Sequence, residues 1–162
     1  HVKGRKRRPI KVESPEGTVD IRKHCIVADL GCGTGKLVEA TVLRDDTSPG
    51  TIGSIKHTEK TVQCITKEKL SIVSFDVVST KPFITQADIS DLPLPNQSIS
   101  LVVICLSLLG ENYVDVLLEA YRVLVPEGGM IVIAEVASRL KTPYARRKFA
   151  ELLEGAGFQN VH

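Results

Sequence analysis

Aromatic residues are scarce in this 162-residue sequence, which has no tryptophan, three tyrosines and four phenylalanines. Few side chains are therefore available to stack on a bound base. No apolar run approaches the roughly 18 residues of a membrane-spanning helix, and no basic segment followed by an apolar one resembles a secretory leader. We therefore expect a soluble, intracellular protein with no membrane partner.

Cysteine is also sparse, and its spacing does not fit the common metal or disulfide patterns. The four cysteines are Cys25, Cys32, Cys64 and Cys105. They form no CxxC pair and have no histidine partner at zinc-finger spacing, so neither a zinc site nor a disulfide framework is favoured. Cys32 and Cys105 have no adjacent base that would activate a thiolate. We expect reduced thiols that fill apolar space, and no bound metal.

Basic residues gather at two places, although the net charge is only +2. Residues 1–11 carry six bases and no acid, and residues 139–148 carry five more bases. The chain between them, 12–138, has ten bases and seventeen acids and is therefore acidic. If the two basic segments meet on one face, they form a patch suited to the phosphates of nucleic acid. A solvated surface, or a nuclear-import signal in residues 3–8, would give the same pattern.

Short apolar runs alternate with helical patterns along most of the chain. Strands are expected at residues 25–30, 70–75, 83–86, 99–106 and Met130–Ala134, and helices at residues 36–43, 112–124 and from Pro143 onward. This order predicts an α/β fold with a mostly parallel sheet, helices on both faces and right-handed crossovers. We expect a single domain over residues 1–162, with a basic N-terminal segment at 1–24 and a surface insertion at 44–69. An insertion of that length leaves room for a short element of its own.

Caps and apolar spacing indicate how the two later helices begin and which face each buries. Asn112 is suited to cap the first of them, and Thr142 followed by Pro143 is suited to begin the second. The side chains expected on the buried face of the helix at 112–124 are Val114, Leu117, Leu118, Tyr121 and Leu124. Those expected for the last helix are Phe149, Leu152, Leu153 and Ala156.

A glycine-rich turn follows the first of these strands. Asp29 lies at the end of this strand, and Gly31, Gly33 and Gly35 come next, before a helix. This order brings backbone N–H groups and a helix N-terminus to the carboxyl edge of the sheet, where a ligand can approach glycine closely. We expect Asp29 to hold the turn through backbone amides. A purely structural turn is the alternative.

Two carboxylates at later strand ends extend this site. Asp76 can accept two hydrogen bonds from ribose hydroxyls, and Asp88 can accept one from an exocyclic amine. Together with the glycine turn, they describe a nucleoside bound along the sheet edge. Lys36 stands where a pyrophosphate-binding motif places its third glycine, so the GxGxG spacing favours S-adenosylmethionine over NAD.

Several segments resemble known methyltransferases. VADLGCGTG resembles the first motif of class I methyltransferases, and LVPEGGMIVIAEV resembles their fifth strand with the preceding turn. A closer resemblance, over residues 26–43 and 70–161, is to the ribosomal RNA-processing protein 8 family. The segments that carry it are SFDVVS, ITQADISDLPLPNQSISLVVICLSLLGENYVDVLLEAYRVLVPEGGMIVIAEVASRL and FAELLEGAGF.

This resemblance implies a Rossmann-like sheet and methylation of adenine N1 in large-subunit ribosomal RNA. It also implies S-adenosylmethionine as cofactor, S-adenosylhomocysteine as product, and a place in ribosome biogenesis in the nucleus and nucleolus. We expect a monomer. By motif position, the implied cofactor contacts are His1, Gly31, Gly33, Asp76, Asp88, Ile89 and Cys105.

Three features depart from the family pattern. Its tryptophan-proline segment before the first strand is absent, and residues 44–69 exceed its short link. A class I fold also normally adds an antiparallel strand pair after the region that ends here at His162, so we expect either an open sheet edge or strands outside this sequence.

Methyl transfer from a sulfonium depends mainly on the alignment of donor and acceptor, so we assign no catalytic residue. Adenine N1 lies on the Watson–Crick edge, and the target base must therefore be unpaired or flipped out. Tyr113 is the aromatic residue nearest in sequence to the expected target pocket, and it equally suits the helix that it begins. We expect Glu135 to pair with Arg139 rather than with substrate.

Two other functions stay open at the level of sequence. One is a cofactor-binding module that regulates or docks on chromatin or preribosomes without turnover. The other is a methyltransferase that acts on a protein or a small molecule, in which case the basic segments would be incidental.

Overall fold

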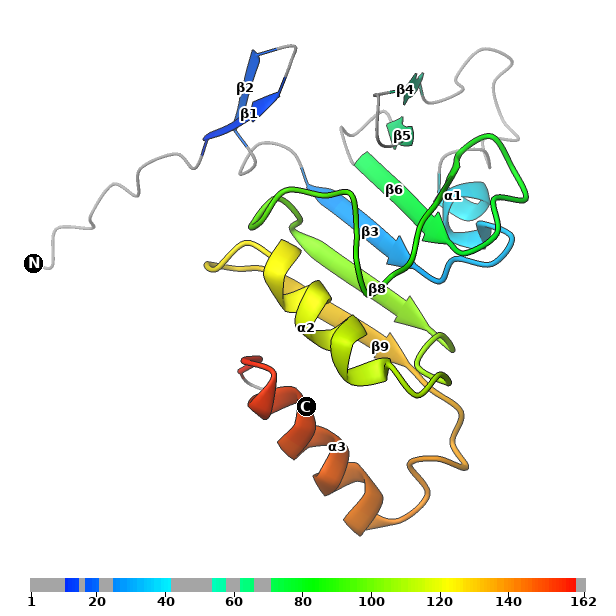
Figure 1. Cartoon of the computed structure of the whole chain (residues 1–162), viewed down its shortest axis with the longest axis vertical. Coiled ribbons are helices and arrows are strands. Elements are labelled where there is room, and N and C mark those ends of the chain that lie inside the picture. The colour runs from blue at the N-terminus through cyan, green and yellow to red at the C-terminus, as the bar shows by residue number, and fades with distance from the viewer. Residues whose placement is uncertain are drawn as a thin grey trace, which may run out of the picture.

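The computed structural model describes residues 11–14, 17–20, 25–41, 54–57, 62–65 and 71–159 (Figure 1). The strands are β1 (Lys11–Ser14), β2 (Gly17–Asp20), β3 (Ile26–Leu30), β4 (Ser54–His57), β5 (Val62–Ile65), β6 (Ser71–Asp76), β7 (Ile84–Gln86), β8 (Leu101–Cys105) and β9 (Met130–Ala134). The helices are α1 (Lys36–Thr41), α2 (Tyr113–Val123) and α3 (Pro143–Gly155). The five strands expected from the sequence are present, with bounds within two residues of those expected.

Five strands of a seven-stranded sheet run parallel to one another. β6, β3, β8 and β9 lie side by side in that order, and β7 pairs with the other edge of β6. That edge is shared: β5 pairs antiparallel with residues 71–73, and β7 pairs parallel with residues 74–76. β4 pairs antiparallel with β5, so the segment expected as an insertion at 44–69 adds two strands to the sheet. β1 and β2 form a separate antiparallel pair.

Helices cover both faces of the sheet, as the alternation of buried side chains shows. Ala28 and Val73 pack on the face that carries α2 and α3. Their neighbours Val27 and Ile72 pack on the opposite face, with Val38 of α1. Because successive side chains of a strand point to opposite faces, near-continuous burial is what a parallel sheet with helices on both sides requires.

The buried face of α2 differs from the one expected. The residues that α2 buries are Val116, Leu117, Glu119, Ala120 and Val123. Leu117 and, at the C-cap, Leu124 are buried as expected. Val114, Leu118 and Tyr121 are instead exposed by 38%, 48% and 50%. Both stripes have helical spacing, and the small side chain of Ala120 lets the buried stripe approach the sheet closely. The expectation for Val114, Leu118 and Tyr121 is therefore wrong.

α3 begins as the sequence predicts. The Thr142 hydroxyl accepts a hydrogen bond from the Ala145 N–H at 3.1 Å, and Pro143 is the first helical residue. Leu153 and Phe149 pack against the core beneath α2.

Asn112 stands at the N-cap of α2, but its side chain makes no capping hydrogen bond. In the part of the chain that the structure describes, no helix combines the length and apolar character that a membrane span needs.

Candidate functional site

The glycine turn between β3 and α1 depends on glycine at each of its three positions. Gly31, Gly33 and Gly35 have φ values of +67°, +57° and +70°, in the left-handed region that other residues avoid. A Cβ atom on Gly31 would lie 2.2 Å from the Ser107 Oγ, and one on Gly35 would lie 2.5 Å from the Phe83 ring. A Cβ on Gly33 would meet no atom within 4 Å. The turn is therefore packed at both ends and open at its centre.

Backbone groups of β6 hold the turn. The N–H groups of Gly31 and Cys32 both donate to the Phe75 carbonyl, at 2.9 and 3.0 Å. Asp29 is buried, but within the described part of the chain no hydrogen bond to its carboxylate is found. The expectation that Asp29 holds the turn through backbone amides is therefore wrong, because the adjacent strand already supplies the acceptor.

Asp76 brings the glycine turn and the end of β6 together. Its Oδ2 accepts a hydrogen bond from the Gly33 N–H at 2.8 Å, and its Oδ1 accepts one from the Val78 N–H at 3.2 Å. A carboxylate has about four acceptor positions, so Asp76 keeps capacity for further donors. It lies at the open centre of the turn, beside Gly33.

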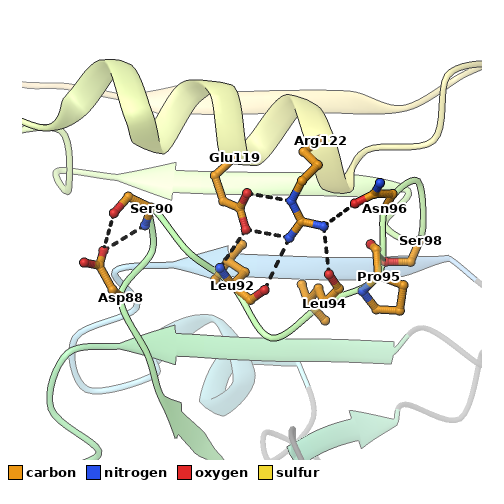
Figure 2. Close-up of polar contacts among 9 residues, drawn as sticks. All are labelled: Asp88, Ser90, Leu92, Leu94, Pro95, Asn96, Ser98, Glu119 and Arg122. Carbon is orange, nitrogen blue, oxygen red and sulfur yellow. Dashed lines mark hydrogen bonds and ion pairs between the residues drawn. The ribbon is translucent and has the colours of Figure 1, made fainter.

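Asp88 and Ile89 follow β7 at the same edge of the sheet. The Asp88 Oδ1 accepts hydrogen bonds from the Ser90 N–H at 2.9 Å and from the Ser90 hydroxyl at 2.7 Å (Figure 2). These bonds lower the pKa of Asp88, which keeps the carboxylate ionised, and none of the described residues donates to its Oδ2. The Ile89 Cδ1 lies 3.8 Å from where a Cβ on Gly31 would be. The structure thus brings Ile89 against the glycine turn.

The end of β8 completes the edge. Cys105 is exposed, so the expectation that it fills apolar space is wrong. The Ser107 hydroxyl lies 3.0 Å from both the Cys105 and the Gly31 carbonyl oxygens. Leu106 between them has a φ of +58°, which is rare for a bulky side chain, and its N–H donates to the Ala134 carbonyl at 2.9 Å. Sequence patterns provide no signal for this strained leucine or for the Ser107 contact, because both depend on the neighbouring strands.

Acidic groups dominate the electrostatics of the turn. Burial, followed by the nearby charge of Asp76, raises the pKa of Asp29 to about 6. Burial and these two carboxylates also raise the pKa of Cys32 to about 12, so its thiol stays protonated and cannot act as a nucleophile. The site therefore favours a ligand with positive charge or with several hydrogen-bond donors. No group of three or more potential metal ligands is found among the described residues.

Comparisons with known proteins decide the family. A family model described as a hypothetical methyltransferase matches residues 42–162. The chain belongs to this methyltransferase family. Ribosomal RNA-processing protein 8 of Dictyostelium discoideum is 41% identical over 120 residues, which make up 74% of this chain and 24% of that protein. The 25S rRNA (adenine(645)-N(1))-methyltransferase of Saccharomyces cerevisiae is 34% identical over 149 residues, or 91% of this chain and 35% of that protein.

These relatives confirm the resemblance to the ribosomal RNA-processing protein 8 family, and the chain spans about a quarter to a third of their length. Among solved structures, a SAM-dependent methyltransferase from Aquifex aeolicus has a TM-score of 0.55 at 17% identity, covering 85% of this chain and 74% of that one. This similarity confirms the Rossmann-like α/β fold expected from the sequence.

The other residues singled out in the sequence have mostly structural contacts in this methyltransferase. Glu135 pairs with Arg139 at 3.0 Å, as expected. Tyr113 begins α2 and packs against the core. His1 lies outside the described residues. A cavity of about 1230 Å³ lies along β9, α2 and α3, and neither the glycine turn nor Asp76 lines it.

Proposed function

We propose that this domain binds S-adenosylmethionine at the edge formed by the glycine turn, Asp76 and Asp88 and uses it for methyl transfer. The observation that supports this most directly is the contact between the Asp76 carboxylate and the Gly33 N–H, at the one point of the turn with open space. A ribose can approach there, and Asp76 can accept from its hydroxyls while still bonding the turn. Asp88 offers its unused Oδ2 to the exocyclic amine of the adenine.

The other proposed cofactor contacts among the described residues lie along the same edge of the sheet. Gly31 and Ile89 provide an apolar wall for the adenine ring, and Cys105 lies at the end of β8 toward the acceptor side. We retain His1 as a proposed contact on the family resemblance alone. When bound, S-adenosylmethionine supplies an electrophilic methyl group. The protein's task is then to hold donor and acceptor in line, so an acid or base residue is not required.

We further propose that the acceptor is adenine N1 of large-subunit ribosomal RNA, and that the protein acts in the nucleus and nucleolus during ribosome biogenesis. The names of the two relatives support this choice of substrate. The basic segment at 139–148 also supports it, because Arg139 follows β9 and donates to the Leu108 carbonyl at 2.8 Å, close to the end of β8. Phosphate-binding side chains would thus lie near the acceptor side of the edge.

Calorimetry with S-adenosylhomocysteine tests the cofactor site. Asp76→Ala should weaken binding by about tenfold or more, because it removes a charge-assisted hydrogen bond worth about 1.5–3 kcal/mol. Asp115→Asn, which neutralises an exposed carboxylate on α2, is the matched control and should bind like the wild type. Since Asp76 also bonds two backbone amides, the unfolding of each variant is measured alongside. Equal affinity of Asp76→Ala and wild type would contradict the ribose assignment.

Incubation with labelled S-adenosylmethionine and ribosomal RNA that lacks the modification tests the reaction. We expect the label in 1-methyladenosine. Cofactor binding without any transfer would instead support the non-catalytic module, and label in a protein or a small molecule would contradict the RNA assignment.

A further inference from the structure

We propose that Glu119 and Arg122 of α2 are positioning residues, which hold the loop at 87–98 so that Asp88 and Ile89 meet the cofactor. This inference rests on the proposed function, because it gives the loop between β7 and β8 a part in cofactor binding. The loop forms no strand over residues 87–98, so its backbone polar groups need partners from elsewhere. α2 supplies them.

The pair contacts the loop between Leu92 and Asn96 (Figure 2). The Leu92 N–H donates to the Glu119 Oε1 at 2.6 Å. The Arg122 Nη1 donates to the Leu94 carbonyl at 2.9 Å and to the Asn96 Oδ1 at 2.5 Å, and its Nη2 donates to the Leu92 carbonyl at 3.3 Å. Two side chains from one helix thus satisfy both polar backbone groups of Leu92 and a further carbonyl two residues later.

The two side chains also fix each other. The Arg122 Nε and Nη2 donate to the two carboxylate oxygens of Glu119, each at 2.6 Å, in a bidentate arrangement that constrains the planes of both groups. Only 9% of the Glu119 side chain is exposed. Burial alone would raise the pKa of Glu119, but the hydrogen bonds from Arg122 and from the Leu92 N–H outweigh it and lower the pKa. Glu119 is therefore ionised at neutral pH and keeps its acceptors in place.

Leu92 links the pair to the cofactor contacts. Its side chain is buried in the core, and a hydrogen-bonded turn directly precedes it: the Asp91 N–H donates to the Asp88 carbonyl at 3.0 Å. Ser90 binds the Asp88 carboxylate from within the same turn. A displacement of Leu92 would therefore move Asp88 and Ile89 as a unit, which is how supporting groups set the geometry of a binding residue.

If Glu119 and Arg122 served only to stabilise the fold, well-packed apolar side chains could replace them. A buried ion pair contributes little net stability relative to well-packed apolar side chains, because desolvation offsets most of the attraction. What this pair provides that apolar side chains could not is a set of directed hydrogen bonds to the loop. The proposed role is therefore to fix the position of the loop. Loss of the pair should lower cofactor affinity even at temperatures where every variant is folded.

The test compares Arg122→Lys with wild type by calorimetric titration of S-adenosylhomocysteine, well below the unfolding midpoint of both. Lysine keeps the charge but has one donor nitrogen, so it cannot reproduce the bidentate contact to Glu119 together with the bonds that Nη1 makes to the loop, and affinity should fall about tenfold. Glu151→Gln is the matched control, because Glu151 forms an exposed pair with Lys148 at the same i,i+3 spacing, at 2.7 Å, within α3 and away from this loop. The control should bind like the wild type.

A double-mutant cycle with Asp88→Asn separates positioning from general destabilisation. If the pair acts through Asp88, Arg122→Lys should cost much less in the Asp88→Asn background than in wild type. Unchanged affinity of Arg122→Lys would overturn the inference, and so would losses that simply add.

Amide hydrogen exchange gives a readout that needs no ligand. The Leu92 amide and the turn before it should exchange faster in Arg122→Lys, while α3 should not change. If wild type itself fails to bind S-adenosylhomocysteine, the proposed function fails, and the exchange data still decide whether the pair holds the loop. Unchanged exchange at Leu92 would overturn the inference in either case.

Discussion

Two residues at the sheet edge are held by the surrounding structure in an unfavourable state, one because of its charge and one because of its backbone conformation. Asp29 is the clearest charged example, with its carboxyl buried at the end of β3 beside Asp76. Leu106 is the clearest backbone example, held in a left-handed conformation where β8 meets β9. Both lie at the edge where the cofactor is proposed to bind, and strain at such a position is commonly retained for function.

Asp29 should make stability fall as pH rises through the weakly acidic range. Burial and then Asp76 raise its pKa from 3.8 to about 6 in the folded state, so the folded protein binds this proton more tightly than the unfolded chain. This contribution is fully present below pH 3.8 and is lost as pH rises through about 6. In Asp29→Asn the decline should disappear, and the variant should be more stable than wild type at pH 7.

Denaturant unfolding at a series of pH values, from about 3.5 to about 7.5, spans this titration and measures the effect. Glu127→Gln, which changes an exposed carboxylate in the turn before β9, is the control and should keep the wild-type pH dependence. Parallel pH profiles for Asp29→Asn and wild type would show that another group causes the decline.

Leu106→Gly should raise stability by about 1 kcal/mol, because glycine adopts a positive φ without the steric cost that leucine bears. Leu109→Gly is the matched control: Leu109 is also exposed but has no positive φ, so glycine there should give no gain. Thermal unfolding of the two variants provides the measurement. If Leu106→Gly is no more stable than wild type, the left-handed conformation carries no strain.

At the scale of elements, local patterns predicted more of the fold than of the contacts between elements. The five parallel strands and the start of α3 followed from apolar runs and from the Thr142 cap, because these signals are local. The buried face of α2 did not follow, since two apolar stripes had the same spacing and only packing on the sheet selects one. The hydrogen bonds from Arg122 to the loop at 87–98 could not be predicted from the sequence either, because the residues that accept them lie 26 to 30 positions away.

Leu117 and Leu118 of α2 are neighbours in sequence but differ in burial, so their substitution should affect stability differently. Leu117 is fully buried and Leu118 is half-exposed. Leu117→Ala should lower the free energy of unfolding by about 2–5 kcal/mol, because it leaves a cavity in the core. Leu118→Ala should change it by less than about 0.5 kcal/mol. Urea unfolding of both variants measures the difference, and equal losses would mean that α2 packs through the stripe expected from the sequence.

At the scale of the whole molecule, charge separates the proposed cofactor edge from the proposed RNA contacts. The edge is acidic, whereas residues 139–148 carry five bases and lead from β9 into α3. Arg146 and Arg147 are exposed, and both line the cavity along β9 and α3. Because β9 runs parallel to β8, the basic segment starts at the same edge that is proposed to bind the cofactor. An acidic central region would repel phosphate, so the basic segments have to carry the attraction.

Replacing Arg146, Arg147 and Lys148 by glutamine should therefore weaken RNA binding and leave the affinity for S-adenosylhomocysteine unchanged. The logarithm of the RNA affinity should also depend less steeply on the logarithm of the salt concentration, by about 0.7–0.9 for each phosphate that the variant no longer neutralises, because fewer counterions are released on binding. Filter binding or fluorescence anisotropy at several salt concentrations measures this slope. A second variant that neutralises residues 3–8 tests the other basic segment by the same method. If only that second variant flattens the slope, the N-terminal segment alone binds RNA, and the charges at 139–148 belong to an ordinary solvated helix surface.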